Sequence, residues 1–336
     1  MKLWVDKGVW TGHRANEKAA ALNKEEVNHI GVIKHAAYGD LLLTRPFFIT
    51  LKDHFPKCQL TLSVISNYQR GIPYDLIDEV HVVDKDESSW FRFYRNFKKF
   101  GTHDLLFDIT ATTPSFWISY LNEARLKIGY IHKGIERLIY DVAVPRSCYK
   151  LEAETFLDQL LVLGLSYRWP LDFNLPARPV VESKPYIVYF TTASTAQKCW
   201  PWQNFTDLIN MLCTEFENYE HIIISGVADW EIARSRKIFE SLQPKDNLKW
   251  IKGGEEIQKY IQHADLVVSA DTGIRNLAIA TDTATVGIFF DTLPFRYLPR
   301  FGQHKAVYTS TGEVPGVEQV RMAVFDMLTK TMIKKK

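Results

Sequence analysis

Strands and helices alternate along this sequence in two successive runs, and this alternation restricts the possible folds more than any other feature. Short apolar segments at residues 29–34, 59–65 and 104–108 have the length and composition of buried strands. Segments with helical periodicity, such as 41–55 and 152–163, follow or separate them. Because parallel strands are joined by crossover helices, the pattern predicts a parallel sheet covered by helices.

A proline-rich stretch separates the two runs. Its prolines are Pro170, Pro176, Pro179 and Pro185. Clustered prolines mark loops and linkers, and the alternation starts again at residue 186, which predicts a second unit of the same kind. Residues 1–27 show little periodicity. We therefore expect an N-terminal extension (1–27), a Rossmann-like domain (28–176), a linker (177–184) and a second Rossmann-like domain ending in a helix (185–336).

The composition excludes several classes of protein. With 336 residues, of which 46% are hydrophobic, the chain can bury two cores. The formal net charge of +2 is too small for a nucleic-acid-binding surface, so we expect no nucleic acid partner. The four cysteines are widely spaced without a CxxC pair, and we expect no metal site. No membrane-spanning run and no signal-peptide core occur, which predicts a cytoplasmic protein.

Ligands of doubly wound sheets bind beyond the carboxyl ends of the strands, and with two domains we expect them in the cleft between. No GxGxxG motif follows a predicted strand, which disfavours a dinucleotide-dependent oxidoreductase. Asp40 follows the strand at 29–34 and opens a helix. It fits two interpretations: an acid that stabilises the helix start, or a carboxylate that takes a proton from a substrate hydroxyl.

Two segments of the second domain have the composition of phosphate-binding loops. Residues 269–273 follow an apolar strand and start a helix, whose backbone N–H groups suit a pyrophosphate. Hydroxyl residues and Lys198 follow the strand at 186–190 and suit the same ligand. The alternatives are a capped helix start and a solvated loop.

Residues 90–100 predict a basic helix with an aromatic stripe. The stripe suits packing on the core, and the cations suit solvent or an anionic lipid surface. We leave both interpretations open, and with them a peripheral contact with the cytoplasmic face of the inner membrane.

Taken together and in order, four segments resemble the family 9 glycosyltransferases, which include the lipopolysaccharide heptosyltransferases. The segments are AYGDLLLTRP (37–46), HDLLFDIT with ARLKIGY (103–110 and 124–130), KCWP (198–201) and DLVVSADTGIRNLAIA (265–280). The second pair is similar to the family's YDLVIDLQG and RIGF, the third to its Lys-x-Trp-Pro, and the fourth to its DLVVSxDTGxxHLAAA. The resemblance covers about residues 28–330.

The resemblance implies a GT-B architecture: α/β, with two Rossmann-like doubly wound domains facing across a cleft. It also implies an inverting, metal-independent sugar transfer without a cofactor. The implied donor is ADP-heptose or a related nucleotide sugar, and the implied acceptor is a lipopolysaccharide core, either Kdo-lipid A or a heptose-extended core. Asp40 is then the catalytic base, and Lys198 contacts the donor phosphates. Donor contacts are expected from Thr191, Thr192, Ser194, Lys198, Gly226, Asp271, Thr272, Gly273 and Asn276, and acceptor contacts from Tyr38, Gly39, Arg45 and Arg70.

The sequence departs from the family pattern at three places. Asn276, preceded by Arg275, stands where the family has His; residues 290–292 (Phe-Asp-Thr) replace its Gly-Pro-Thr loop; and Arg45 replaces a smaller residue. We expect the side chains of Arg275 and Asn276 to reach a substrate. A different nucleotide-sugar donor, a UDP-N-acetylglucosamine epimerase and a non-catalytic nucleotide- or glycan-binding module remain alternatives.

Overall fold

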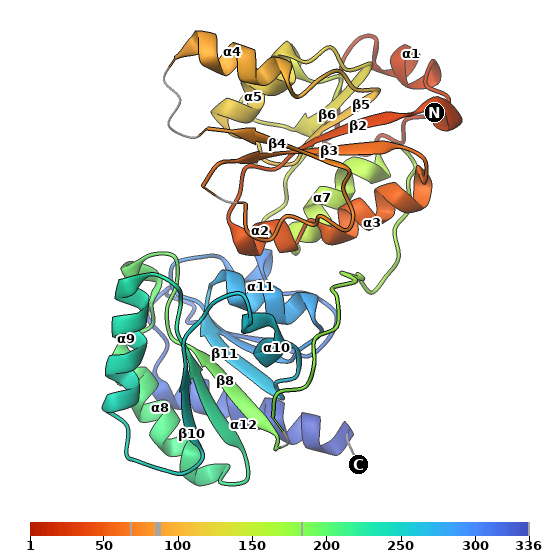
Figure 1. The fold of residues 1–336 in the computed structure, drawn as a ribbon. Coiled ribbons are helices and arrows are strands. Elements are labelled where there is room, and N and C mark those ends of the chain that lie inside the picture. The colour runs from red at the N-terminus through yellow and green to blue at the C-terminus, as the bar shows by residue number, and fades with distance from the viewer. Residues whose placement is uncertain (68, 85–88, 183, 335–336) are drawn as a thin grey trace. The chain divides into compact units, whose positions relative to one another are not determined.

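The computed structural model describes residues 1–67, 69–84, 89–182 and 184–334. Within them the chain divides into two compact units (Figure 1). We call the first the N-terminal unit; it consists of Met1–Cys148 and Glu152–Phe173. The second, the C-terminal unit, consists of Tyr149–Leu151 and Asn174–Lys336. Each unit is an α/β layer structure built on its own sheet, so the predicted fold class is confirmed.

The sheet of the N-terminal unit has the strand order β1-β7-β6-β5-β2-β3-β4. Only β1 runs antiparallel to its neighbour among the described strand pairs. The strands are β1 (Trp10–Thr11), β2 (His29–Ile33), β3 (Gln59–Ile65), β4 (Glu79–Val83), β5 (Leu105–Asp108), β6 (Leu126–Tyr130) and β7 (Val142–Val144). The central strands β2, β3 and β5 are buried along most of their length, as expected when helices cover both faces of a sheet.

The helices of the N-terminal unit lie on both faces of its sheet, with α3 and α7 on one face and α4 and α5 on the other (Figure 1). They are α1 (Ala15–Ala20), η1 (Lys24–Glu26), α2 (Tyr38–Leu42), α3 (Arg45–His54), α4 (Trp90–Lys98), α5 (Thr113–Leu121), α6 (Glu136–Ile139) and α7 (Glu152–Leu161). Phe97 of α4 and Ile118 of α5 pack with Ile33 and Leu106 in one apolar cluster. Ser89 begins α4 by accepting a hydrogen bond from the backbone N–H of Arg92.

Residues 1–27 are part of the N-terminal unit and not the separate extension that we expected. Strand β1 pairs with β7, and α1 buries Ala15 and Ala19 completely. The amino group of Met1 donates to the carbonyls of Ala19 and Leu22. Alanine side chains let a short helix approach the sheet closely, but they produce little hydrophobic periodicity. The sequence pattern therefore missed this packing.

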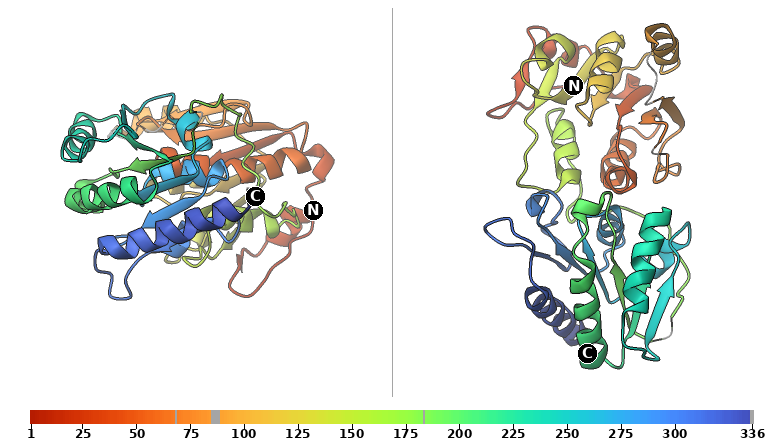
Figure 2. Two further views of the ribbon diagram at one scale, coloured as in Figure 1. Left: turned by 90° about the horizontal axis from the view of Figure 1, so that it is seen from below. Right: turned by 90° about the vertical axis from the view of Figure 1, so that its left-hand side faces the viewer.

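The sheet of the C-terminal unit has the order β10-β9-β8-β11-β12-β13, and all its described strand pairs are parallel. Its strands are β8 (Tyr186–Phe190), β9 (Glu220–Ile224), β10 (Leu248–Ile251), β11 (Leu266–Ala270), β12 (Thr285–Ile288) and β13 (His304–Val307). Its helices are η2 (Ala196–Lys198), α8 (Trp202–Glu215), α9 (Asp229–Glu240), α10 (Ile257–Gln262), α11 (Gly273–Ala280), η3 (Pro294–Arg296) and α12 (Val317–Lys334). Helices α8 and α12 lie side by side over the sheet, where they form one large core (Figure 2).

The proline-rich stretch is bound to the C-terminal unit and is not a free linker. The side chain of Gln258 donates to the carbonyl of Pro176 over 2.7 Å. The backbone N–H of Arg178 donates to Gln262, and its carbonyl contacts the ring of His263. The boundary between the units therefore lies at Phe173, earlier than the expected residue 176. In the described part of the chain, no helix is both long and apolar enough to cross a bilayer.

Candidate functional site

In each sheet there are two neighbouring strands from which the following strands are added in opposite directions. The loops that carry the predicted site residues leave the sheet at this point. In the N-terminal unit this point lies between β2 and β5, because β3 and β4 extend from β2 to one side and β6 and β7 extend from β5 to the other. In the C-terminal unit it lies between β8 and β11. Such points leave a crevice at the carboxyl ends of the two strands, where ligands of doubly wound sheets bind.

Asp40 lies in the first turn of α2, directly after the loop that leaves β2. Ala37 begins the helix with an extended backbone, and its carbonyl accepts from the N–H of Asp40 over 3.1 Å. The side chain of Asp40 is half-buried and Gly39 is buried. The positive end of the helix dipole favours an ionised carboxylate at this position, as a group that accepts a proton requires.

Two predicted acceptor residues contact each other, and one of them, Tyr38, lies in the same helical turn as Asp40. The guanidinium carbon of Arg70 lies 4.9 Å from the centre of the Tyr38 ring, within the range of a cation–π contact. Burial raises the pKa of Tyr38, and the charge of Arg70 opposes this shift. Gly71 has a φ of +87°, and a Cβ there would lie 2.8 Å from the Tyr38 ring, so the close approach requires glycine. The cation–π contact therefore links Arg70 to the helical turn that contains Asp40.

Arg45 is buried at the start of α3 and is already bound. Two of its guanidinium nitrogens donate to the carboxylate of Asp75 over 2.8 and 2.6 Å, and its Nε donates to the carbonyl of Phe173. The hydrogen bond from Arg45 lowers the pKa of Asp75. The acceptor role of Arg45 stays a prediction, and in this structure the side chain joins α3 to the end of the N-terminal unit.

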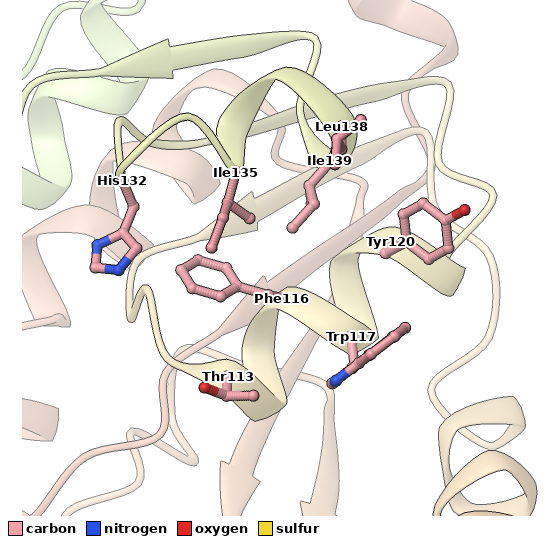
Figure 3. A pocket seen from close by; sticks show the side chains of 8 residues that line it. All are labelled: Thr113, Phe116, Trp117, Tyr120, His132, Ile135, Leu138 and Ile139. Atoms are coloured by element: carbon pink, nitrogen blue, oxygen red, sulfur yellow. The ribbon is translucent and has the colours of Figure 1, made fainter.

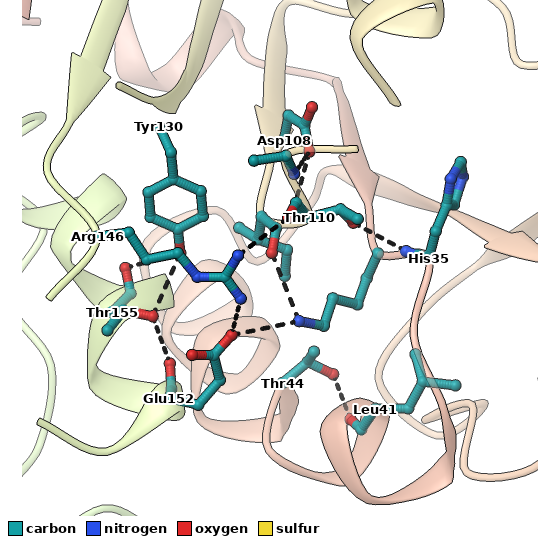
Figure 4. Close-up of polar contacts among 12 residues, drawn as sticks. His35, Leu41, Thr44, Asp108, Thr110, Tyr130, Arg146, Glu152 and Thr155 are labelled. Carbon is teal, nitrogen blue, oxygen red and sulfur yellow. Dashed lines mark hydrogen bonds and ion pairs between the residues drawn. The ribbon is translucent and has the colours of Figure 1, made fainter. Parts of the chain in front are cut away.

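A buried ionic cluster, which the sequence did not reveal, fixes the loop before Asp40. Arg146 donates to the carbonyl of Thr110 over 3.1 Å and to the carboxylate of Glu152 (Figure 4). The ammonium of Lys34 lies 3.8 Å from the same carboxylate. The hydroxyl of Thr110 in turn accepts from the backbone N–H of His35 over 2.8 Å. The cluster therefore joins the carboxyl ends of β2 and β5 to α7 and positions the chain that leads into α2.

His35 lies in the same loop as a buried, neutral imidazole. Burial, with contributions from His81 and Lys34, lowers its pKa to about 4. Its Nε2 lies 3.3 Å from the hydroxyl of Ser63. A neutral ring leaves the charge balance near Asp40 unchanged at neutral pH.

In the C-terminal unit, the loop after β8 carries the predicted phosphate-binding residues. Thr191 and Thr192 are buried and Ser194 is exposed. Lys198 ends the short helix η2, and its ammonium lies 3.5 Å from Asp291, which follows β12. The structure thus brings together a predicted phosphate ligand and one of the residues that replace the family's Gly-Pro-Thr loop.

The loop after β11 lies beside the loop after β8, because the two strands are neighbours. Thr272 begins α11 with an extended backbone, and within the described residues its hydroxyl caps none of the helix N–H groups. Those N–H groups, starting at Gly273, are suited to bind an anion. The carboxylate of Asp271 accepts from the hydroxyl of Thr292 over 2.7 Å, which ties the loops after β11 and β12 together.

Glu231 of α9 joins the loop after β8 to the loop after β9, and the sequence analysis missed this residue. Its carboxylate accepts from the hydroxyl of Thr192 and from the backbone N–H groups of Val227 and Ala228. A Cβ on Gly226 would lie 2.1 Å from the carboxyl carbon of Glu231, so the contact requires glycine at this predicted donor position. The available signal was an acid in the first turn of the helix, where capping-box carboxylates occur.

Arg275 and Asn276 are both buried in α11, and the substrate contact expected of their side chains stays a prediction. The guanidinium of Arg275 donates to the carbonyl of Tyr297 and lies 5.0 Å from the centre of the Phe289 ring. Burial lowers its pKa to about 10. A Cβ on Gly287 would lie 2.4 Å from its Nε, so the arginine packs on β12. The donor contact predicted for Asn276 stays a prediction.

A family model and a curated relative both name heptosyltransferases. The model of glycosyltransferase family 9 (heptosyltransferase) matches residues 103–323. Over 278 residues the chain is 23% identical to lipopolysaccharide heptosyltransferase 3 of Escherichia coli, covering 75% of this chain and 80% of that protein.

Two solved structures show the same fold. The glycosyl transferase family 9 protein of Veillonella parvula DSM 2008 has a TM-score of 0.71 at 15% identity and covers 92% of this chain and 99% of its own. Heptosyltransferase WaaC of E. coli, solved with ADP-2-deoxy-2-fluoro heptose, has a TM-score of 0.70 at 18% identity, with 90% and 99% covered.

Proposed function

The chain belongs to glycosyltransferase family 9, the heptosyltransferase family, and from this premise we propose that it transfers a heptose from ADP-heptose to the inner core of lipopolysaccharide. The proposal for the donor is supported by the ADP-heptose analogue with which the E. coli WaaC structure was solved. The proposal for the acceptor is supported by the name of the related E. coli lipopolysaccharide heptosyltransferase 3. Because such an acceptor is lipid-linked, we also propose peripheral contact with the cytoplasmic face of the inner membrane.

The observation that carries the donor site is a set of contacts at the switch point of the C-terminal sheet. Lys198 lies 3.5 Å from Asp291, and the next residue, Thr292, hydrogen-bonds Asp271 just before the uncapped start of α11. A lysine and several backbone N–H groups supply positive charge and donors for a diphosphate. The same groups stabilise the negative charge that develops on the diphosphate when it leaves.

Asp40 is proposed as the general base. It accepts the proton of the acceptor hydroxyl, whose oxygen forms a bond to the anomeric carbon of the heptose. The bond from that carbon to the diphosphate oxygen breaks, and ADP leaves with the electron pair. A single displacement of this kind inverts the anomeric configuration. Tyr38 and Arg70, which adjoin Asp40, are proposed to orient the acceptor.

The test is a donor screen with the purified protein. ADP-heptose, other ADP-sugars and a set of UDP- and GDP-sugars are each offered with Kdo-lipid A and with a heptose-extended core, and products are identified by mass. Transfer from ADP-heptose alone supports the proposal. Transfer only from another donor would replace the substrate, and binding without any product would point to a non-catalytic module.

Asp40→Asn tests the base in the same assay. We expect turnover to fall about a hundredfold or more, the range for a lost general base, while the affinity for ADP stays unchanged. Asp53→Asn is the matched control, because Asp53 is an exposed acid on α3 of the same unit. Near wild-type turnover of Asp40→Asn would remove Asp40 from the mechanism.

A further inference from the structure

The N-terminal unit contains an apolar pocket whose lining includes neither Asp40 nor any of the predicted acceptor residues. The pocket has a volume of about 470 Å³ and lies between α5 and α6 (Figure 3). Its lining residues are Thr113, Phe116, Trp117, Tyr120, His132, Ile135, Leu138 and Ile139. Phe116 and Ile139 form its floor and belong to the apolar core of the unit. The volume lies within the range of ligand pockets, about 300–1,000 Å³.

The rim of the pocket is unusually apolar for a protein surface. Leu138 is 78% exposed, Tyr120 55% and Trp117 46%. The ring of Trp90 on α4 lies 5.3 Å from that of Trp117, so the apolar surface continues onto α4, where Phe91 is 71% exposed. Contiguous exposed apolar surface of this kind marks an interaction site.

Positive charge surrounds this surface. The exposed cations on α4 and beside α6 are Arg92, Arg95, Lys98, Lys99, Lys133 and Arg137. Residues 89–100 and 113–121 contain no acid, and the exposed Glu123 follows the end of α5. The carboxylate of Glu136 on α6 is buried and accepts from the backbone N–H of His132, so it does not neutralise the rim.

We infer that the pocket between α5 and α6 holds an acyl chain of an anionic phospholipid and docks the N-terminal unit on a bilayer. A specific small molecule needs several converging polar groups, and this lining offers few. A second copy of the chain would bring two sets of cations together, which is unfavourable. Tryptophan and tyrosine at the rim suit the boundary between headgroups and acyl chains, and the cations suit anionic headgroups.

The inference deepens the proposed function, since it rests on an acceptor that is itself lipid-linked. It assigns a place on the molecule for membrane contact, with two separable contributions. The apolar contribution comes from the pocket and is insensitive to salt. The electrostatic contribution comes from α4 and weakens as salt screens the charges.

The experiment measures binding of the full chain to phosphatidylcholine vesicles with and without phosphatidylglycerol. We expect binding to the anionic vesicles, and a partition coefficient about tenfold or more lower for Leu138→Asp at every salt concentration. Met322→Asp is the matched control, because Met322 is 62% exposed on a helix of the C-terminal unit. Replacing Arg92, Arg95, Lys98 and Lys99 by Gln should reduce binding mainly at low salt.

Brominated acyl chains report on insertion, since they quench nearby tryptophans. We expect quenching of the wild type that is reduced in Trp117→Phe. Wild-type binding by Leu138→Asp, or equal quenching of the wild type and Trp117→Phe, would overturn the inference. Transfer to a deacylated, water-soluble core acceptor should be unchanged in Leu138→Asp. If the wild type transfers no sugar at all, the proposed function fails while the vesicle results still decide the lipid site.

Discussion

The ion pair between Lys198 and Asp291 predicts opposite effects of two substitutions on nucleotide binding. The Nζ–Oδ2 distance is 3.5 Å, and the side chains are 30% and 47% exposed. A pair this exposed contributes at most about 1 kcal/mol. A charge-assisted contact from Lys198 to a phosphate contributes about 1.5–3 kcal/mol. We therefore expect the lysine to exchange Asp291 for the phosphate at a cost of at most about 1 kcal/mol.

The magnitudes follow from these two energies, because each 1.4 kcal/mol is about tenfold in affinity. Lys198→Ala should weaken ADP binding about twofold to a hundredfold, because the lost phosphate contact is partly offset by the ion pair that no longer has to break. Asp291→Asn should strengthen ADP binding by up to about fivefold, since Lys198 then meets the phosphate without breaking a pair. In the Asp291→Asn background, the loss caused by Lys198→Ala should grow by the same factor.

Calorimetry tests whether Lys198 contacts a phosphate. ADP and adenosine are each titrated into the wild type, both single variants and the double variant. Adenosine lacks phosphate, so its dissociation constant should change little in any variant. Equal losses of ADP and adenosine affinity in Lys198→Ala would refute a phosphate contact. Weaker ADP binding by Asp291→Asn would show that Asp291 itself contacts the ligand and does not compete with it.

Two further predictions concern buried charge. Arg275→Ala should lower the free energy of unfolding by about 2–4 kcal/mol, because it leaves a cavity beside Phe289 and removes the hydrogen bond to Tyr297. Arg275→Met fills that space without a charge, so in denaturant titrations it should lower the free energy of unfolding less than half as much. Equal losses in the two variants would contradict a packing role. Burial lowers the pKa of His221 to about 4 from an ordinary 6.5, so the unfolded chain takes up its proton first and stability falls as the pH drops from 6.5 towards 4. Thermal melts of His221→Gln should show a flatter slope over that interval, and an unchanged slope would exclude this histidine as a cause.

The sequence predicted the strands and helices well where the pattern was long and periodic. Strands β3 and β8 have the predicted bounds, since short segments rich in apolar residues and flanked by turn-forming residues define them locally. The sequence did not predict β13 (His304–Val307), which is only half-buried at the edge of its sheet and therefore lacks an apolar run. It also missed β1, whose two residues are a strand only because β7 lies beside them.

The sequence by itself determined the alternation of strands and helices, the family motifs and the loops that hold Asp40, Lys198 and Gly273. Parallel strands have their carboxyl ends at the same edge of a sheet, so local patterns were enough to predict which loops lie together there. Only the tertiary structure decided which charges are already paired or buried. In the sequence, Arg275 and Lys198 look alike, as cations in loops or helix starts. In the structure, β12 and the loop after it bury Arg275, and Asp291 of that loop pairs with Lys198. Burial and pairing are set by residues distant in the chain, which no local pattern records.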